Sequence, residues 1–200
     1  MIKINVILGS SRPASLGRGL FKYLKQRQDQ FAAAGKVSIN FMDLADYQLP
    51  FFYEDVPPMA NKGDRHLAAN EQQFVTEMGE ADGYLIIVPE YNHAIPAVLK
   101  NALDFLAFEG RNKPVKVLTY ATSSRGGQFA FLALLPVLAQ LGMFTLPKPM
   151  VVTNINQNFT LEGDLKSDAP SADFYAKRLQ QVFSELGFYS DLFKNNPYQH

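Results

Sequence analysis

Three short segments of the sequence carry polar side chains and glycines in patterns suited to binding a small molecule. The first, GSSRPASLGRG (9–19), follows the apolar stretch 3–8 and contains three serines and two arginines. Serine hydroxyls and N–H groups at a helix start bind anions, and arginine adds a permanently charged donor that suits phosphate. The glycine spacing of the common nucleotide-binding loops is absent. Two interpretations stay open: a phosphate site, or an ordinary loop in which Ser15 caps the next helix.

The second segment, PEYNHAIP (89–96), follows the most hydrophobic stretch of the chain, GYLIIVP (83–89). Pro89 removes one N–H group and fixes a backbone dihedral angle, and Tyr91 offers a flat face with one hydroxyl. Backbone held in this way presents N–H and C=O groups to the edge of a planar heterocycle. The alternatives are that Tyr91 packs within the loop and that Asn92 forms a turn.

The third segment is ATSSRGGQFA (121–130), in which two adjacent glycines, Gly126 and Gly127, permit close approach of the backbone. Its polar side chains come from Thr122, Ser123, Ser124 and Arg125. The segment is expected to border the same ligand as the other two.

Alternating strand-like and helix-like stretches position these segments. Strands are predicted over 3–8, 37–44, 83–89, 114–121 and 145–152, and helices over 15–33, 64–80, 95–106, 127–141 and 171–187. This order predicts an α/β fold: one doubly wound, five-stranded parallel sheet with helices on both faces, in a single domain over 1–200. Ligands bind such sheets beyond the carboxyl ends of the strands, where the strand order reverses. The three polar segments are therefore expected to meet at one edge.

Composition excludes several other classes of protein. The 200 residues include no cysteine, which excludes a disulfide scaffold, a zinc–cysteine site, an iron–sulfur cluster and a thiol nucleophile. The formal net charge is zero, so nothing indicates nucleic-acid binding. The uncharged stretch 129–146 is interrupted by Pro136, Gln140 and Gly142, and it predicts a buried helix and a short strand instead of a membrane span. With no signal-peptide pattern at the start, a cytoplasmic location is expected.

The motifs resemble those of one known family. VPEYNHAIPAVLKNALDFL (88–106) resembles the signature P-E-Y-N, Pro, L-K-N-A-[IL]-D of the NADPH-dependent FMN reductase family of flavodoxin-fold enzymes, which includes quinone, chromate and azo-dye reductases. GSSRPAS (9–15) resembles the phosphate loop of that family, and SSRGGQ (123–128) resembles its glycine-rich third loop. Order and spacing match over residues 3–152.

This resemblance implies a flavodoxin-like domain that binds FMN. It assigns the phosphate to Gly9, Ser10, Arg12 and Ser15, with support from Ser11 and Leu16. It places Pro89, Glu90, Tyr91 and Asn92 beside the isoalloxazine ring, and Ser123, Ser124, Arg125, Gly126 and Gly127 on its far side. Arg125 departs from the family pattern, where this loop is often smaller. The departure either alters access to the flavin or supplies a cation for a nicotinamide dinucleotide phosphate.

The implied activity is transfer of hydride from NADPH or NADH to FMN and then to a quinone-like or other small acceptor. The cofactor carries the chemistry, so no side chain is expected to act as a catalytic acid or base, and no metal is expected. His93 is interpreted as a surface or hydrogen-bonding residue. The alternative is an FMN-binding electron carrier without NAD(P)H activity, and the neutral charge balance argues against it.

Family members commonly form dimers or tetramers, so a homodimer or homotetramer is expected. The uncharged stretch 126–147 fits a subunit interface and fits a core helix equally well. The aromatic segment 50–58 either lines the acceptor pocket or packs over the edge of the sheet.

Overall fold

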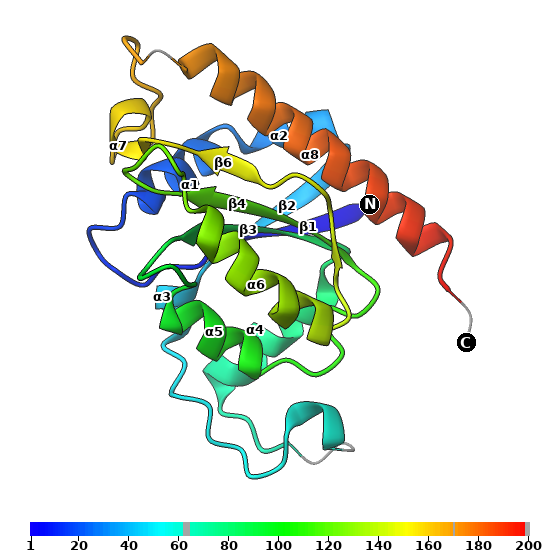
Figure 1. The fold of residues 1–200 in the computed structure, drawn as a ribbon. Helices are drawn as coiled ribbons and strands as arrows, with labels where there is room; N and C mark the ends of the chain where they lie inside the picture. Colours follow the sequence, from blue (N-terminus) through cyan, green and yellow to red (C-terminus); the bar gives the residue numbers. More distant parts are fainter. Residues whose placement is uncertain (62–64, 170, 199–200) are drawn as a thin grey trace.

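The computed structural model describes residues 1–61, 65–169 and 171–198, and its centre is a parallel β-sheet (Figure 1). The sheet runs in the order β2-β1-β3-β4-β5, with β6 also paired to β4. Its strands are β1 (Ile2–Leu8), β2 (Val37–Asp43), β3 (Gly83–Pro89), β4 (Pro114–Tyr120), β5 (Phe144–Thr145) and β6 (Met150–Val152). Every paired strand is parallel to its neighbour. The doubly wound, flavodoxin-like α/β prediction is therefore confirmed.

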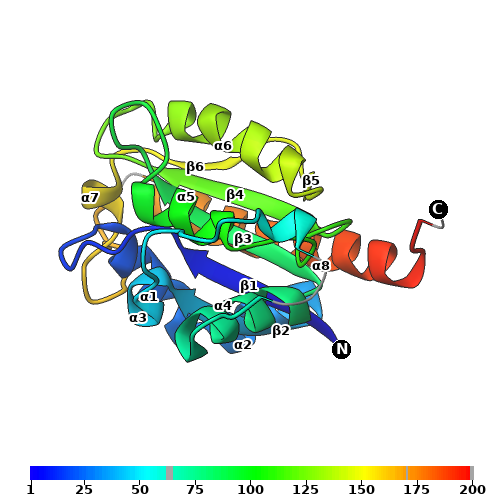
Figure 2. The ribbon, with the colours of Figure 1, turned by 90° about the horizontal axis from the view of Figure 1, so that it is seen from below.

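Helices cover both faces of the sheet (Figure 2). They are α1 (Gly17–Gln26), α2 (Gln28–Gly35), α3 (Leu44–Tyr47), α4 (Ala69–Glu80), α5 (Ala97–Asp104), α6 (Gln128–Gln140), α7 (Ile155–Asn158) and α8 (Ala172–Asn195), with a 3₁₀ turn at Pro58–Ala60. Two hydrophobic clusters lie on opposite sides of the strands. One packs α1, α2 and α8, and the other packs α4, α5 and α6.

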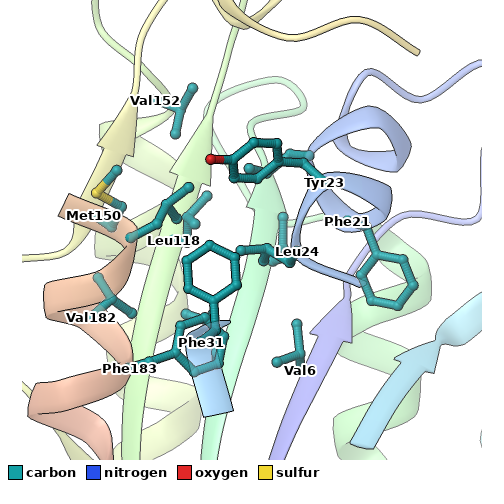
Figure 3. Packing of buried hydrophobic residues seen from close by; sticks show 14 of the residues in the cluster. Val6, Phe21, Tyr23, Leu24, Phe31, Leu118, Met150, Val152, Val182 and Phe183 are labelled. Carbon is teal, nitrogen blue, oxygen red and sulfur yellow. The ribbon is translucent and has the colours of Figure 1, made fainter. Parts of the chain in front are cut away.

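Figure 3 shows part of the first cluster, where Phe31 of α2 stacks on Phe183 of α8 with ring centroids 5.0 Å apart. Every residue of β3 and β4 is buried, which explains why these strands read as nearly continuous apolar runs. At roughly 25 cal/mol per Å² of apolar surface removed from water, burial of these side chains is the main stabilising contribution to the fold.

Four of the predicted elements have other boundaries in the structure. The helix predicted over 15–33 is two helices that meet at Arg27. The strand predicted over 145–152 is divided into β5 and β6, because Pro147 and Pro149 have no N–H group to donate to a strand ladder.

The last predicted helix, 171–187, continues to Asn195. Gly187 marks a contact instead of a helix end, since a Cβ there would lie 2.1 Å from the Gly35 carbonyl oxygen. The helix predicted over 64–80 begins at Ala69, and residues 62–64 lie outside the described residues. The segments α3, α7 and Pro58–Ala60 were not predicted.

In the described residues, no helix is long and apolar enough to cross a membrane.

The strand order reverses between β1 and β3, and this position determines where the polar segments lie. The loops after β1, β3 and β4 lie with α7 at one end of the sheet, opposite the two chain termini (Figures 1 and 2). The fold therefore brings the three polar segments to the edge where ligands bind doubly wound sheets.

Candidate functional site

A cleft of about 310 Å³ opens between these loops. Its lining combines Arg12, Ala14, Ser15 and Leu16 from the first loop with Pro89, Glu90 and Tyr91 from the second, and with Tyr120, Ala121, Thr122 and Ile155. Six of the predicted site residues thus share one cavity.

The first loop leaves the sheet at Gly9, whose N–H donates to the Ile87 carbonyl oxygen at 2.9 Å. A Cβ at Gly9 would lie 3.0 Å from that oxygen and 3.1 Å from Cδ2 of Leu99. Glycine is therefore needed there for close packing of the loop against β3 and α5. Gly9 itself is buried and does not line the cleft.

Ser15 does not cap the helix, contrary to one of the two interpretations of the sequence. The residue before α1 is Leu16, and no side-chain cap is made there. The Ser15 hydroxyl is buried and shares a 2.8 Å hydrogen bond with the hydroxyl of Tyr120 at the end of β4. Burial raises the pKa of Tyr120 to about 12, so this phenol stays neutral at physiological pH.

Tyr91 joins the second loop to the first. Its hydroxyl lies 3.0 Å from Oγ of the buried Ser10, and its ring lies 5.7 Å from the guanidinium carbon of Arg12. The next two residues, Asn92 and His93, have φ angles of 51° and 61°. They form a tight turn closed by reciprocal Tyr91–Ala94 hydrogen bonds. Asn92 is thus an exposed turn residue outside the cleft lining.

Glu90 connects the second loop to the third. Its carboxylate accepts a hydrogen bond of 2.9 Å from the N–H of Phe129, and the N–H of Ala130 lies 3.4 Å away. These amides belong to the first turn of α6, where a negative charge is favoured by the helix dipole. Glu90 therefore lines the cleft and also fixes the start of α6.

The third loop reaches the cleft only through its first residues, Ala121 and Thr122. Ser123, Ser124 and Arg125 are exposed beyond it. Gly126 and Gly127 have φ angles of 60° and 83°, and a Cβ at Gly126 would lie 2.2 Å from Cγ1 of Val151. The glycines therefore pack against the sheet, and contact between residues 123–127 and a cofactor stays a prediction.

Several donors of the first loop have no partner within the protein. Over the described residues, the N–H groups of Ser11, Arg12, Ala14 and Leu16 make no hydrogen bond, and the Arg12 guanidinium makes no ion pair. Ser11, Arg12 and Ala14 are exposed. A cation and several unbonded amides in one loop form a donor set for an anion, and this set fits the phosphate of FMN.

Tyr120, Ala14, Ala121 and Ile155 line the cleft but were not predicted as site residues. Tyr120 is the last residue of a buried strand. Its spacing from Leu118 indicated only a side chain packed in the core. Ile155 lies beside the cleft because its N–H donates to the Ala121 carbonyl oxygen, a hydrogen bond between segments that are distant in the sequence.

Comparison with known proteins accords with this geometry. The sequence profile described as NADPH-dependent FMN reductase matches residues 2–157, most of the chain. The chain belongs to the NADPH-dependent FMN reductase family.

Curated relatives match nearly the whole chain. An NAD(P)H-dependent FMN reductase of Schizosaccharomyces pombe is 27% identical over 206 residues, covering 98% of this chain and 92% of the relative. An NADPH azoreductase of Bacillus sp. is 29% identical over 194 residues, covering 96% and 95%.

A solved structure shows the same fold. It is FerB, a flavoenzyme NAD(P)H:(acceptor) oxidoreductase from Paracoccus denitrificans, with a TM-score of 0.73 and 21% identity. The likeness covers 96% of this chain and 98% of FerB.

Proposed function

We propose that this protein of the NADPH-dependent FMN reductase family binds FMN in the cleft between its three loops and oxidises NAD(P)H there. The electrons pass to a quinone-like or other small acceptor. The relatives named for FMN reduction and azo-dye reduction support this activity.

The main support for this site is a set of hydrogen-bond donors in the first loop that make no hydrogen bond among the described residues. Arg12 and the N–H groups of Ser11, Ala14 and Leu16 provide charge and hydrogen bonds for one phosphate. Pro89 and Tyr91 provide an apolar and aromatic border along the same cleft, which suits a flat ring.

Bound FMN supplies the hydride and electron chemistry. The residues of the chain position it. Tyr91 ties the second loop to Ser10, Glu90 ties it to α6, and Ser15 ties the first loop to Tyr120. These bonds join groups of the protein itself, and they restrict the movement of the loops that would hold the cofactor.

The nearest test is spectroscopic. The purified protein, titrated with FMN, is expected to quench flavin fluorescence and to retain flavin absorbance after gel filtration. Mixed with NADPH without oxygen, the loaded protein is expected to lose that absorbance within seconds. No retained flavin would overturn the whole proposal. Retained flavin that NADPH and NADH both fail to bleach would indicate an electron carrier without NAD(P)H activity.

Two further statements stay predictions. The cytoplasmic location and the homodimeric or homotetrameric state accord with the proposed activity, and fractionation and analytical ultracentrifugation would test them.

A further inference from the structure

A second cationic group, Arg125, lies on the loop after β4, whose first residues, Ala121 and Thr122, line the cleft. The guanidinium carbon of Arg125 lies 5.9 Å from the ring centroid of Phe129. The His93 ring also stacks on Phe129, with centroids 4.4 Å apart and an interplanar angle of 23°. Segments from two loops, 89–96 and 121–130, thus form one group of planar side chains, here named the rim stack (Arg125, Phe129 and His93).

The backbone around the rim stack is held in place by other contacts. Glu90 binds the N–H of Phe129, which fixes the first turn of α6 beside the second loop. His93 occupies the second central position of a tight turn at φ 61°, a position that glycine fills more readily. The turn itself therefore does not require a histidine.

The charge of the rim stack is not neutralised by the protein. Arg125 and His93 are exposed, and in residues 1–61, 65–169 and 171–198 neither makes an ion pair or hydrogen bond. The nearby carboxylate of Glu90 is occupied by the amides of α6. Stacking on Phe129 leaves the edge of the Arg125 guanidinium, where its N–H donors lie, free for a ligand.

The loops around the cleft thus carry two arginines that make no ion pair among the described residues, Arg12 in the first loop and Arg125 in the third. FMN carries a single phosphate, which the donors around Arg12 suit. The second substrate of the proposed reaction is a dinucleotide, and its two forms differ only by one phosphate on the adenosine ribose. An exposed arginine beside an aromatic ring suits recognition of that phosphate, because guanidinium binds phosphate oxygens through two parallel hydrogen bonds.

We infer that Arg125 and His93 bind the 2′-phosphate of NADPH and make this protein prefer NADPH to NADH. The inference rests on the proposed function, and it names the residues and the phosphate that determine the choice of co-substrate.

The test compares both nucleotides on two variants. Arg125→Gln keeps a polar side chain and removes the charge, and His93→Asn keeps a residue that tolerates positive φ. In the FMN-loaded protein, Arg125→Gln is expected to raise KM for NADPH about tenfold or more, as for loss of one charge-assisted hydrogen bond. A smaller increase is expected for His93→Asn. KM for NADH is expected to rise less than KM for NADPH, because NADH has no 2′-phosphate, so the ratio of the two KM values is the quantity that tests the inference.

Arg111→Gln is the matched control. Arg111 lies over the ring of Phe108, with a distance of 5.8 Å from its guanidinium carbon to the ring centroid. It precedes β4 and so lies at the opposite end of the sheet from the cleft. This variant is expected to leave KM for both nucleotides unchanged.

A binding measurement separates this inference from the proposed function. Calorimetric titration with 2′,5′-ADP and with 5′-AMP needs neither FMN nor turnover. Wild type is expected to bind 2′,5′-ADP more tightly, and Arg125→Gln is expected to lose that difference. Equal increases in KM for NADPH and NADH would overturn the inference, because the charge would then act on the shared pyrophosphate. Unchanged KM values, or equal binding of both fragments by wild type, would overturn it too. A protein that retains no flavin would instead refute the proposed function.

Discussion

Replacing Tyr120 with phenylalanine removes one hydroxyl from the floor of the cleft and keeps the buried ring. That hydroxyl shares a 2.8 Å hydrogen bond with Ser15, a residue only 3% exposed. Tyr120→Phe leaves the Ser15 hydroxyl buried without this partner, which costs about 1–3 kcal/mol. The same range applies to Ser15→Ala, because the Tyr120 residue is only 4% exposed.

The double variant gives the sharper expectation. When both hydroxyls are absent, neither is left without its partner, so the double variant is expected to be about as stable as either single variant. The interaction free energy of the mutant cycle is then about 1–3 kcal/mol, the size of one single effect. Urea unfolding of the two single variants, the double variant and wild type measures it, with an unchanged m-value as the check that all four unfold alike.

The cycle also has a result that refutes the reasoning. If the two single effects add to the double effect within about 0.3–0.5 kcal/mol, the hydroxyls act independently. The loop would then be held by other contacts, such as the packing of Gly17 against Tyr120, where a Cβ would lie 2.4 Å from the phenol oxygen. FMN titration of the same variants shows whether the anchor also affects binding, and a several-fold weaker Kd is expected for Tyr120→Phe.

Three other predictions concern the same site. Arg12→Ala is expected to weaken FMN binding by about tenfold or more and to leave the free energy of unfolding unchanged. The control variant, Arg178→Ala on α8, is expected to change neither quantity. Equal FMN affinity in wild type and both variants would mean that the phosphate binds elsewhere. Glu90→Gln is expected to lower the melting temperature by roughly 1–4 °C at low salt, since it removes a negative charge from the start of α6. If the melting temperatures of wild type and variant differ as much in 1 M salt, the helix dipole is not the cause. Alkaline pH is expected to destabilise the protein: with burial raising the pKa of Tyr120 to about 12, the unfolded chain loses this proton above pH 10 while the folded chain keeps it. Stability therefore falls between about pH 10 and 12, and Tyr120→Phe is expected to lose up to about 3 kcal/mol less over that interval. Parallel pH profiles would show that Tyr120 does not contribute.

The parts of the fold that were predicted correctly depend on local patterns. The apolar runs of β3 and β4 and the alternation of strands with helices are visible within short windows, and they determine the sheet and the edge at which the loops meet. A local signal for the division of the last strand was also present in the sequence, although a single strand was predicted. The prolines on either side of Lys148 have no N–H group for ladder hydrogen bonds. In contrast, the last helix was predicted to end at Gly187, whereas this glycine lies inside α8 and is required by a contact with Gly35 of α2, far away in the sequence.

The same distinction applies to the residues that line the cleft. Pro89, Glu90 and Tyr91 were predicted as site residues from one short motif, and all three line the cleft. Ser15 was offered as a helix cap because capping is the local use of serine, yet its partner Tyr120 is 105 residues away. No short pattern marks such a pair, and only the sheet order brings the end of β4 beside the first loop.

The contacts around the cleft also distinguish two kinds of polar residue in the first loop: those bonded within the protein and those free to bind a ligand. The hydroxyls of Ser10 and Ser15 are buried and bonded to tyrosines, so they stabilise the loops. The Arg12 guanidinium and the N–H groups of Ser11, Ala14 and Leu16 make no hydrogen bond or ion pair within the described residues, so they are the groups left for a ligand. Substituting a serine should therefore change the unfolding free energy first, and substituting Arg12 should change affinity first. Under the proposed function, the polar character of GSSRPAS thus reflects two separate requirements, anchoring of the loop and binding of an anion, which fall on different residues.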